Sequence, residues 1–447
     1  MVPDRCPAGH GTPYDTGDGH RVSLYSPEFA ADPHGTYQSM RQRFGPLAPV
    51  ELAAGVPATL VLGYRTAVNI LHDPVRFPAD PRKWEKTIPQ DSPVRAMLGW
   101  QPAARFHDGS AHDRYRDASS YAIAEIDLHG LQDSVEALAI PRINTFCGRG
   151  SADLAADYAF PLVFDVLNHM IGCSPEIGNE VAAGMAARFD SGPDAAAGMA
   201  RASAALIELI RHKRAAPGDD ITSRLALHHA NFTDRELLAQ LLSFYGAGIE
   251  PIRNLMTNTL LLMLTDGRFG GGLLSGSLMT RDALDEVLFA DPPMANFCAT
   301  YPRQPIMVDK TWIPADQPVL ISISACHRDP DIAGGDLTGN RSHLAFGAGP
   351  HLCPAKDVAY LIAQHAIDQL LDALSDIRLA VPAKHLTWRP GPFHRALQQL
   401  PVIFPETAPL DTSSNFRSLL DQNPGSISAR LPQRRAPDRR GVCDADL

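Results

Sequence analysis

Apolar residues recur at helical spacing along most of the chain. The stretch from the 120s into the 140s and the segment 196–211 both follow this pattern, which is typical of amphipathic helices. Thr233-Asp-Arg-Glu236 matches a capping box, in which the hydroxyl and the carboxylate each satisfy a free N–H at a helix start. The residues that follow, from about Asp234 to Leu264, are apolar on nearly all sides. This pattern predicts a long helix that runs through the centre of the protein.

Short apolar runs lie between the helical segments. Residues 58–62 (ATLVL) end at Gly63, and residues 319–323 (VLISI) follow Pro318, so both are expected to form strands. Helical segments outnumber such runs. The sequence therefore predicts a mainly α protein with a smaller β-sheet region.

The chain has 447 residues, but no Pro-, Gly- or Ser-rich linker divides its middle. We therefore expect one large domain over residues 23–410, preceded by a flexible lead at 1–22. Residues 411–447 are polar, rich in Arg and poor in aromatic residues, a composition that favours a disordered tail. A single domain of this length is large enough to enclose a large prosthetic group.

The formal net charge of −10 argues against nucleic acid as the main partner, because binding phosphate groups requires an excess of basic residues. The first 20 residues contain no long apolar segment, so we expect neither a signal peptide nor a membrane anchor. Seven widely spaced cysteines favour a reducing, cytoplasmic compartment. Cys6 and His10 are too few ligands to indicate a metal site, and we expect His228 and His229 to be a solvated pair in a loop.

The clearest chemical signal is the segment FGAGPHLC, which ends at Cys353 and is followed at once by a helical pattern. Gly347 and Gly349 allow the backbone to approach a flat group closely. Cys353 precedes the predicted helix, and the dipole and free N–H groups of a helix N-terminus favour a thiolate. Such a thiolate, held against haem iron, would promote O–O bond cleavage. The alternative for this motif is a small buried cysteine beside a glycine turn.

The segment resembles the haem-binding signature of the cytochrome P450 superfamily, Phe-Gly-x-Gly-x-His/Arg-x-Cys, at every defined position. The similarity covers about residues 25–405. It implies the cytochrome P450 fold, bound haem b and Cys353 as the iron ligand. It also assigns to the haem site Phe346, Gly347, Gly349 and His351, the last as a propionate contact.

A second matching segment is His112-Asp-Arg-Tyr-Arg116, which resembles the His-x-x-x-Arg helix of the family. Residues four apart share one helix face, so both side chains are expected to reach the same haem propionate. Without the resemblance, a solvated helix face would be the simpler interpretation. We also place Arg303 with the cofactor-binding residues.

Two departures from the family pattern affect the predicted function. The central helix of the family carries Ala-Gly-x-Asp/Glu-Thr beside the iron, whereas this chain has Ala247-Gly248-Ile-Glu250-Pro251. In the family the Thr hydroxyl orders water and helps to deliver protons, and proline has no hydroxyl. Pro251 also clashes with the carbonyl of Ala247 at a cost of about 3 kcal/mol in a regular helix, so we expect a kink beside Gly248. Two explanations for Pro251 remain: a change in the chemistry of the site, or the loss of functional demand at this position.

The second departure concerns the Glu-x-x-Arg pair of the family, for which this chain has Glu286 and Phe289. Breaking a buried pair of this kind costs about 3–5 kcal/mol. We therefore expect Glu286 to pair with Arg303 or Arg341, or to stay protonated. A small group of soluble bacterial P450s resembles this chain in lacking the Arg.

The resemblance implies a haem-thiolate oxidoreductase, a monooxygenase that oxidises a small apolar molecule with dioxygen or peroxide. Ala247, Gly248, Glu250 and Pro251 are the expected catalytic positions. The sequence contains no flavin or nicotinamide motif, so we expect electrons from an external ferredoxin and its reductase. Peroxide-driven turnover or oxidative coupling would depend less on the missing alcohol. The alternative is a catalytically silent P450-like haem protein that serves as a scaffold, sensor or partner.

Overall fold

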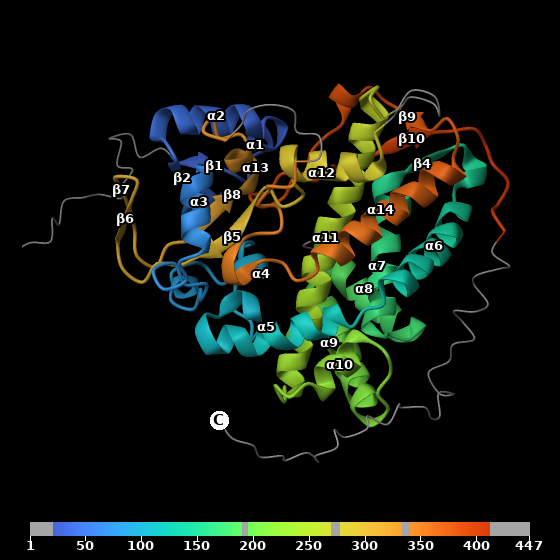
Figure 1. Ribbon diagram of the computed structural model, residues 1–447, viewed down its shortest axis with the longest axis horizontal. Helices are drawn as coiled ribbons and strands as arrows, with labels where there is room; N and C mark the ends of the chain where they lie inside the picture. The colour runs from blue at the N-terminus through green and yellow to red at the C-terminus, as the bar shows by residue number, and fades with distance from the viewer. Residues whose placement is uncertain (1–20, 190–194, 270–277, 333–339, 412–447) are drawn as a thin grey trace, which may run out of the picture.

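A β-sheet region and a larger group of helices lie side by side, with helix α11 (Asp234–Thr265) in the middle of the helical part (Figure 1). The computed structural model describes residues 21–189, 195–269, 278–332 and 340–411. The predicted lead at 1–22 and tail at 411–447 lie almost wholly outside these ranges. The prediction of a mainly α protein with a smaller sheet is confirmed.

The main sheet has the strand order β1-β2-β3-β8-β5, and its three central strands are almost completely buried. Its strands are β1 (Val22–Ser23), β2 (Leu47–Ala53), β3 (Val56–Val61), β8 (Val319–Ser322) and β5 (Asn296–Thr300). A hairpin joins β2 to β3 through Gly55, whose φ of 72° suits glycine. Strand β3 pairs in parallel with β8, so the two predicted strands lie next to each other in the sheet.

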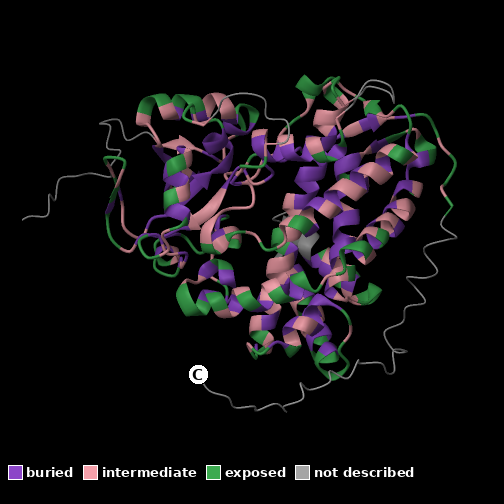
Figure 2. Ribbon diagram, in the orientation of Figure 1, coloured by how far each residue is buried: buried purple, intermediate pink, exposed green. Residues whose placement is uncertain are grey.

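Helices supply most of the remaining core, and buried residues concentrate in the sheet and on the inward faces of the helices (Figure 2). The longer helices besides α11 are α2 (Pro33–Phe44), α5 (Gly109–Ala124), α6 (Leu128–Asn144), α7 (Phe160–Ile171), α8 (Pro175–Phe189), α9 (Ala195–Ala215), α12 (Thr280–Ala290) and α14 (Lys356–Ala373). The shorter ones are α1 (Pro27–Ala31), α3 (Tyr64–Leu71), α4 (Arg95–Leu98), α10 (Ile221–Leu227) and α13 (Ile323–His327). None of the described helices has the length and hydrophobicity needed to cross a membrane.

Two small sheets complete the fold. The first has the order β4-β10-β9, formed by β4 (Ser151–Asp153), β10 (Pro401–Ile403) and β9 (Arg378–Leu379). The second is a hairpin of β6 (Ile306–Val308) and β7 (Thr311–Ile313). The first of these sheets holds the C-terminal part of the described chain against the segment that follows α6.

The central helix α11 begins at the predicted capping box. The Glu236 N–H donates to the Thr233 hydroxyl at 3.3 Å, and the Thr233 N–H donates to the Glu236 carboxylate at 2.9 Å. Pro251 lies inside the helix, which neither ends nor breaks there. Helix α11 packs against α7, α12 and α14, so it connects both sides of the helical region.

Candidate haem site

The segment that ends at Cys353 forms a tight loop before helix α14. Gly347 and Gly349 adopt φ values of 75° and 67°, a region that favours glycine. A Cβ atom on Gly349 would lie 2.2 Å from the carbonyl oxygen of Leu71 in α3, so a side chain cannot be accommodated there. The Cys353 N–H closes the loop by donating to the Phe346 carbonyl at 2.8 Å. The loop geometry therefore fixes the position of the thiol.

The electrostatic environment of Cys353 differs from the prediction made from its place before a helix. Burial raises the pKa of the Cys353 thiol, although a hydrogen bond from the Ala355 backbone and the charge of Arg116 act in the opposite direction. Within the described residues the thiol form is therefore favoured. A strong positive charge next to the sulfur, such as a ferric ion, is what would make the thiolate the stable form.

Helix α5 brings two basic side chains to the same place. The side chain of His112 is 5% exposed, and its Nδ1 atom lies 3.1 Å from the Asp113 carboxylate. Its Nε2 atom is buried without a hydrogen-bond partner among the described residues, and so is the Nε atom of Arg116. The rings of His112 and His351 lie 4.5 Å apart, and His351 comes from the cysteine loop. Four of the predicted residues therefore meet: Cys353, Arg116, His112 and His351.

The unpaired atoms of His112 and Arg116 are the test of whether haem fits here. A buried polar atom without a partner costs about 1–3 kcal/mol, so the two unpaired nitrogens indicate that a hydrogen-bonding group belongs at this place. An anionic acceptor such as a propionate would satisfy both. Burial lowers the pKa of His112 and of Arg116, and a nearby anion would reverse that effect. The donor set and the glycine loop fit haem.

Arg303 does not belong to this group of residues. Its guanidinium lies 3.0 Å from the Asp80 carboxylate and 3.8 Å from that of Asp316. Both acids stand in loops of the β-sheet region. Arg303 therefore links two loops in the structure.

The open face of α11 contains Gly246 and Ala247, which are exposed although they lie in the middle of a largely buried helix. A Cβ atom on Gly248 would meet the side chain of Leu167 at 2.9 Å, so Gly248 lets α11 approach α7 closely. Of the predicted catalytic positions, Ala247 therefore faces open space, whereas Gly248 faces a neighbouring helix. Pro251 is half-buried.

Glu250 is held in a cluster of charged side chains. Its carboxylate contacts the Arg389 guanidinium directly, accepts from Asn254 at 3.3 Å and lies 3.5 Å from the Arg253 guanidinium. Burial alone would raise the pKa of Glu250, but the two guanidiniums outweigh it and hold the pKa below its usual range. The carboxylate is therefore ionised. Sequence reasoning missed Arg389, because no local spacing relates it to Glu250.

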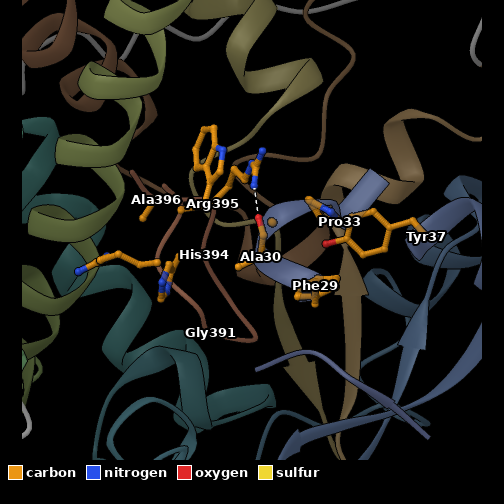
Figure 3. A pocket seen from close by; sticks show the side chains of 11 residues that line it. Phe29, Ala30, Pro33, Tyr37, Gly391, His394, Arg395 and Ala396 are labelled. Carbon is orange, nitrogen blue, oxygen red and sulfur yellow. Dashed lines mark hydrogen bonds between the residues drawn. The ribbon is translucent and has the colours of Figure 1, made fainter. Parts of the chain in front are cut away.

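A cavity of about 10 Å³ lies beside Arg389 and His394 (Figure 3). It is large enough for about one water molecule and too small for a substrate. Arg395 crosses beside it, donates to the Ala30 carbonyl at 2.7 Å and stacks on Trp388 at 3.4 Å. These contacts fix the segment that carries Arg389 against helix α1.

The prediction for the ion-pair partner of Glu286 is wrong. Glu286 pairs with Arg268 at 2.7 Å rather than with Arg303 or Arg341. The fully buried carboxylate is the neighbouring Asp285, which accepts from Arg341 at 2.8 Å and from the Tyr360 hydroxyl at 2.6 Å. Adjacent residues of a helix point about 100° apart, so only one of the two acids faces the interior.

Comparisons with known proteins identify relatives that cover most of the chain. No protein-family model matches the chain. The monooxygenase PikC of Streptomyces venezuelae, a cytochrome P450, is 30% identical over 391 residues, which cover 84% of this chain and 92% of PikC. The vitamin D(3) 25-hydroxylase of Pseudonocardia autotrophica is 26% identical and is covered to 95%. The solved structure of the P450 monooxygenase TamI with tirandamycin C is similar at a TM-score of 0.71, with 25% identity over 86% of this chain and 99% of TamI.

The helix-rich fold and these relatives together define a haem-binding oxidoreductase. The chain belongs to the cytochrome P450 family. Members of this family bind haem b, and haem b is the cofactor of this chain.

Proposed function

We propose that this protein is a P450 monooxygenase in which Cys353 binds the haem iron and Ala247 faces the oxidised molecule. The observation that carries the proposal is the meeting of Cys353 with the unpaired atoms of His112 and Arg116. Bound haem supplies an iron centre that activates dioxygen or peroxide. The remaining steps depend on what the side chains of this chain hold and orient.

On the cysteine side, the chain positions and neutralises the cofactor. Arg116 and protonated His112 would hold a propionate by donating to it through the Nε and Nε2 atoms that are otherwise unpaired. His351 is the second loop residue on this side, next to His112. Phe346 supports the loop through its ring contact with Tyr360, which in turn binds Asp285. A continuous series of contacts therefore links the loop that carries Cys353 to Arg341.

On the opposite side, Gly246 and Ala247 leave room for a small apolar molecule beside α11. Pro251 offers no hydroxyl where the family has threonine, so it cannot hold water or pass a proton. Glu250 is ionised and bound to Arg389 and Arg253, which restricts its movement. We therefore infer that proton delivery is the weak step when dioxygen is the oxidant. Peroxide, or a substrate that supplies its own proton, depends less on that step.

The sequence and the relatives support an external electron donor and a small apolar substrate. No flavin or nicotinamide motif occurs in the sequence, so an external ferredoxin with its reductase supplies electrons. PikC is a monooxygenase and the Pseudonocardia autotrophica relative a hydroxylase of vitamin D(3), while TamI binds tirandamycin C. A small, largely apolar molecule is consistent with these relatives and with the open face at Ala247.

The absorption spectrum of the reduced, carbon-monoxide-bound protein tests the proposal. We expect a strongly red-shifted Soret band, because a thiolate ligand produces it. The variant Cys353→His should retain haem but lose the red shift, while Cys147→Ser, a matched control at a buried cysteine, should leave it unchanged. The same spectrum for the wild type and Cys353→His would overturn the assignment. A normal spectrum without substrate oxidation, by either ferredoxin or peroxide, would favour the silent haem protein.

A further inference from the structure

A group of three potential metal ligands lies away from the haem site, where helix α5 meets the segment between α10 and α11. The group consists of Asp117 on α5 and the consecutive His228 and His229. His228 was predicted to be solvated, and this is wrong because its side chain is only 6% exposed. His229 is 82% exposed, as predicted for a loop residue.

The distances between the ligand atoms match those in a metal site. The Nε2 atoms of His228 and His229 lie 3.5 Å and 3.4 Å from the same Asp117 carboxylate oxygen. Bonds of 2.0–2.2 Å at a tetrahedral angle place neighbouring ligand atoms about 3.3–3.6 Å apart. The two rings have centroids 4.1 Å apart, so both imidazoles face the same carboxylate. The three side chains therefore need little movement to bind one ion.

The surroundings favour a cation and leave room for water. The groove beside the cluster has a volume of about 420 Å³, which is enough for the water ligands that complete the coordination of an open site. Arg224 also lines the groove, but its charge is paired with Asp219. Within the described residues, the ion-pair partners of Asp117 are the two imidazoles. A metal ion would therefore replace only the contacts of 3.5 Å and 3.4 Å between Asp117 and the two imidazoles.

Metal binding would change one hydrogen bond of His228. Its Nδ1 atom accepts from the Ala230 N–H at 3.2 Å. Coordination through Nε2 moves the proton to Nδ1, and the Ala230 amide must then turn away. Metal binding is thereby coupled to the conformation of the segment that leads into α11.

We propose that Asp117, His228 and His229 bind one first-row divalent cation, with Zn²⁺ as the preferred ion and water as the remaining ligand. Two imidazoles and one carboxylate are a donor set that zinc commonly uses. The site would tie α5, which carries His112 and Arg116, to the start of α11. It requires no haem for its formation.

Equilibrium dialysis of the haem-loaded full chain against Zn²⁺, with metal content measured by atomic emission, tests the proposal. We expect one Zn²⁺ per chain in the wild type, and affinity at least about tenfold lower in Asp117→Asn and in His229→Ala. Both positions are exposed, so these variants should fold, which an unchanged haem spectrum would verify. The variant His129→Ala, which removes an exposed histidine elsewhere, should bind as the wild type does.

A second variant separates this site from the ends of the chain. Cys6→Ser/His10→Ala should keep the bound zinc, and zinc should raise the Tm of this variant and of the wild type but not of Asp117→Asn. Loss of zinc in Cys6→Ser/His10→Ala would overturn the proposal. So would unchanged affinity in both Asp117→Asn and His229→Ala, or no stoichiometric binding by the wild type.

Discussion

The imidazole of His327 stacks on the ring of Phe289, with centroids 4.7 Å apart and an interplanar angle of 22°. Its Nδ1–H donates to the Phe289 carbonyl and its Nε2 accepts from the Leu344 N–H, both at 2.7 Å. Burial lowers the pKa of His327 to about 4, so the ring is neutral and uses both nitrogens. Phe289 stands where the family has arginine, and His327 joins α12 to the segment before the cysteine loop without a charge.

We expect His327→Ala to lower the free energy of unfolding by about 2–5 kcal/mol, because it leaves a buried carbonyl and a buried amide unpaired. Phe289→Leu should cost less, about 1 kcal/mol, since it removes the stacking but keeps both hydrogen bonds. Urea unfolding at equal haem occupancy measures both values. Equal losses in the two variants would show that the hydrogen bonds of His327 contribute nothing.

The capping box of α11 predicts a loss of stability in acid. Glu236 accepts from Arg114 at 2.5 Å and from the Tyr115 hydroxyl at 2.8 Å, and these contacts, with the Thr233 amide, lower its pKa from 4.5 to about 2. A lowered pKa in the folded state stabilises the protein above pH 4.5, and this contribution is lost as the pH falls towards 2. Glu236→Gln should remove that part of the pH dependence. Tm measured in steps from pH 2 to 6 checks it, and parallel curves for both proteins would contradict it.

Arg389 should stabilise the fold chiefly through Glu250. Arg389→Met leaves the buried carboxylate with the more distant Arg253 and should cost about 3–5 kcal/mol. Glu250→Gln/Arg389→Met also removes the unpaired carboxylate, but Arg253 then loses its ion-pair partner. The double variant should therefore regain only part of the stability lost in Arg389→Met. Urea unfolding at pH 7 compares them. A double variant as unstable as Arg389→Met would show that Arg389 acts through other contacts, such as its place beside the cavity with His394.

The missing hydroxyl at Pro251 should be visible in the choice of oxidant. With a small apolar probe that changes the haem spectrum on binding, we expect more product from peroxide than from ferredoxin and its reductase. Pro251→Thr should reverse this ratio, because it restores a group that can hold water near Ala247. Pro251→Ala relieves the helix constraint without adding a hydroxyl and should leave the ratio unchanged. An equal change in Pro251→Thr and Pro251→Ala would attribute the effect to the backbone.

Local features of the fold could be predicted from the sequence because neighbouring residues determine them. The capping box at Thr233, the glycine loop before Cys353 and the strand at 58–62 each depend on a few adjacent residues. The direction of Gly248 was also accessible, since it lies about 100° around the helix from Ala247. The family motif groups Ala247 with Gly248, and this grouping does not show that the two residues face in different directions.

Long-range charge pairs could not be predicted in the same way. Glu250 and Arg389 are 139 residues apart, and Asp285 and Arg341 meet only after α12 and the segment before the cysteine loop have packed. The choice of Asp285 rather than Glu286 as the buried acid depends on the rotation of one helix. When a helix is apolar on several sides, the spacing of its apolar residues does not predict which side faces the interior.

The close approach of Gly349 to the Leu71 carbonyl has a consequence for engineering. The cysteine loop packs against α3, a helix from the first part of the chain. The loop therefore cannot be exchanged between proteins without that helix. A chimaera that takes this loop from a relative with a bulkier residue at position 349 would have to take α3 from the same relative. Cys353 is thus positioned as much by residues 64–71 as by the motif that surrounds it.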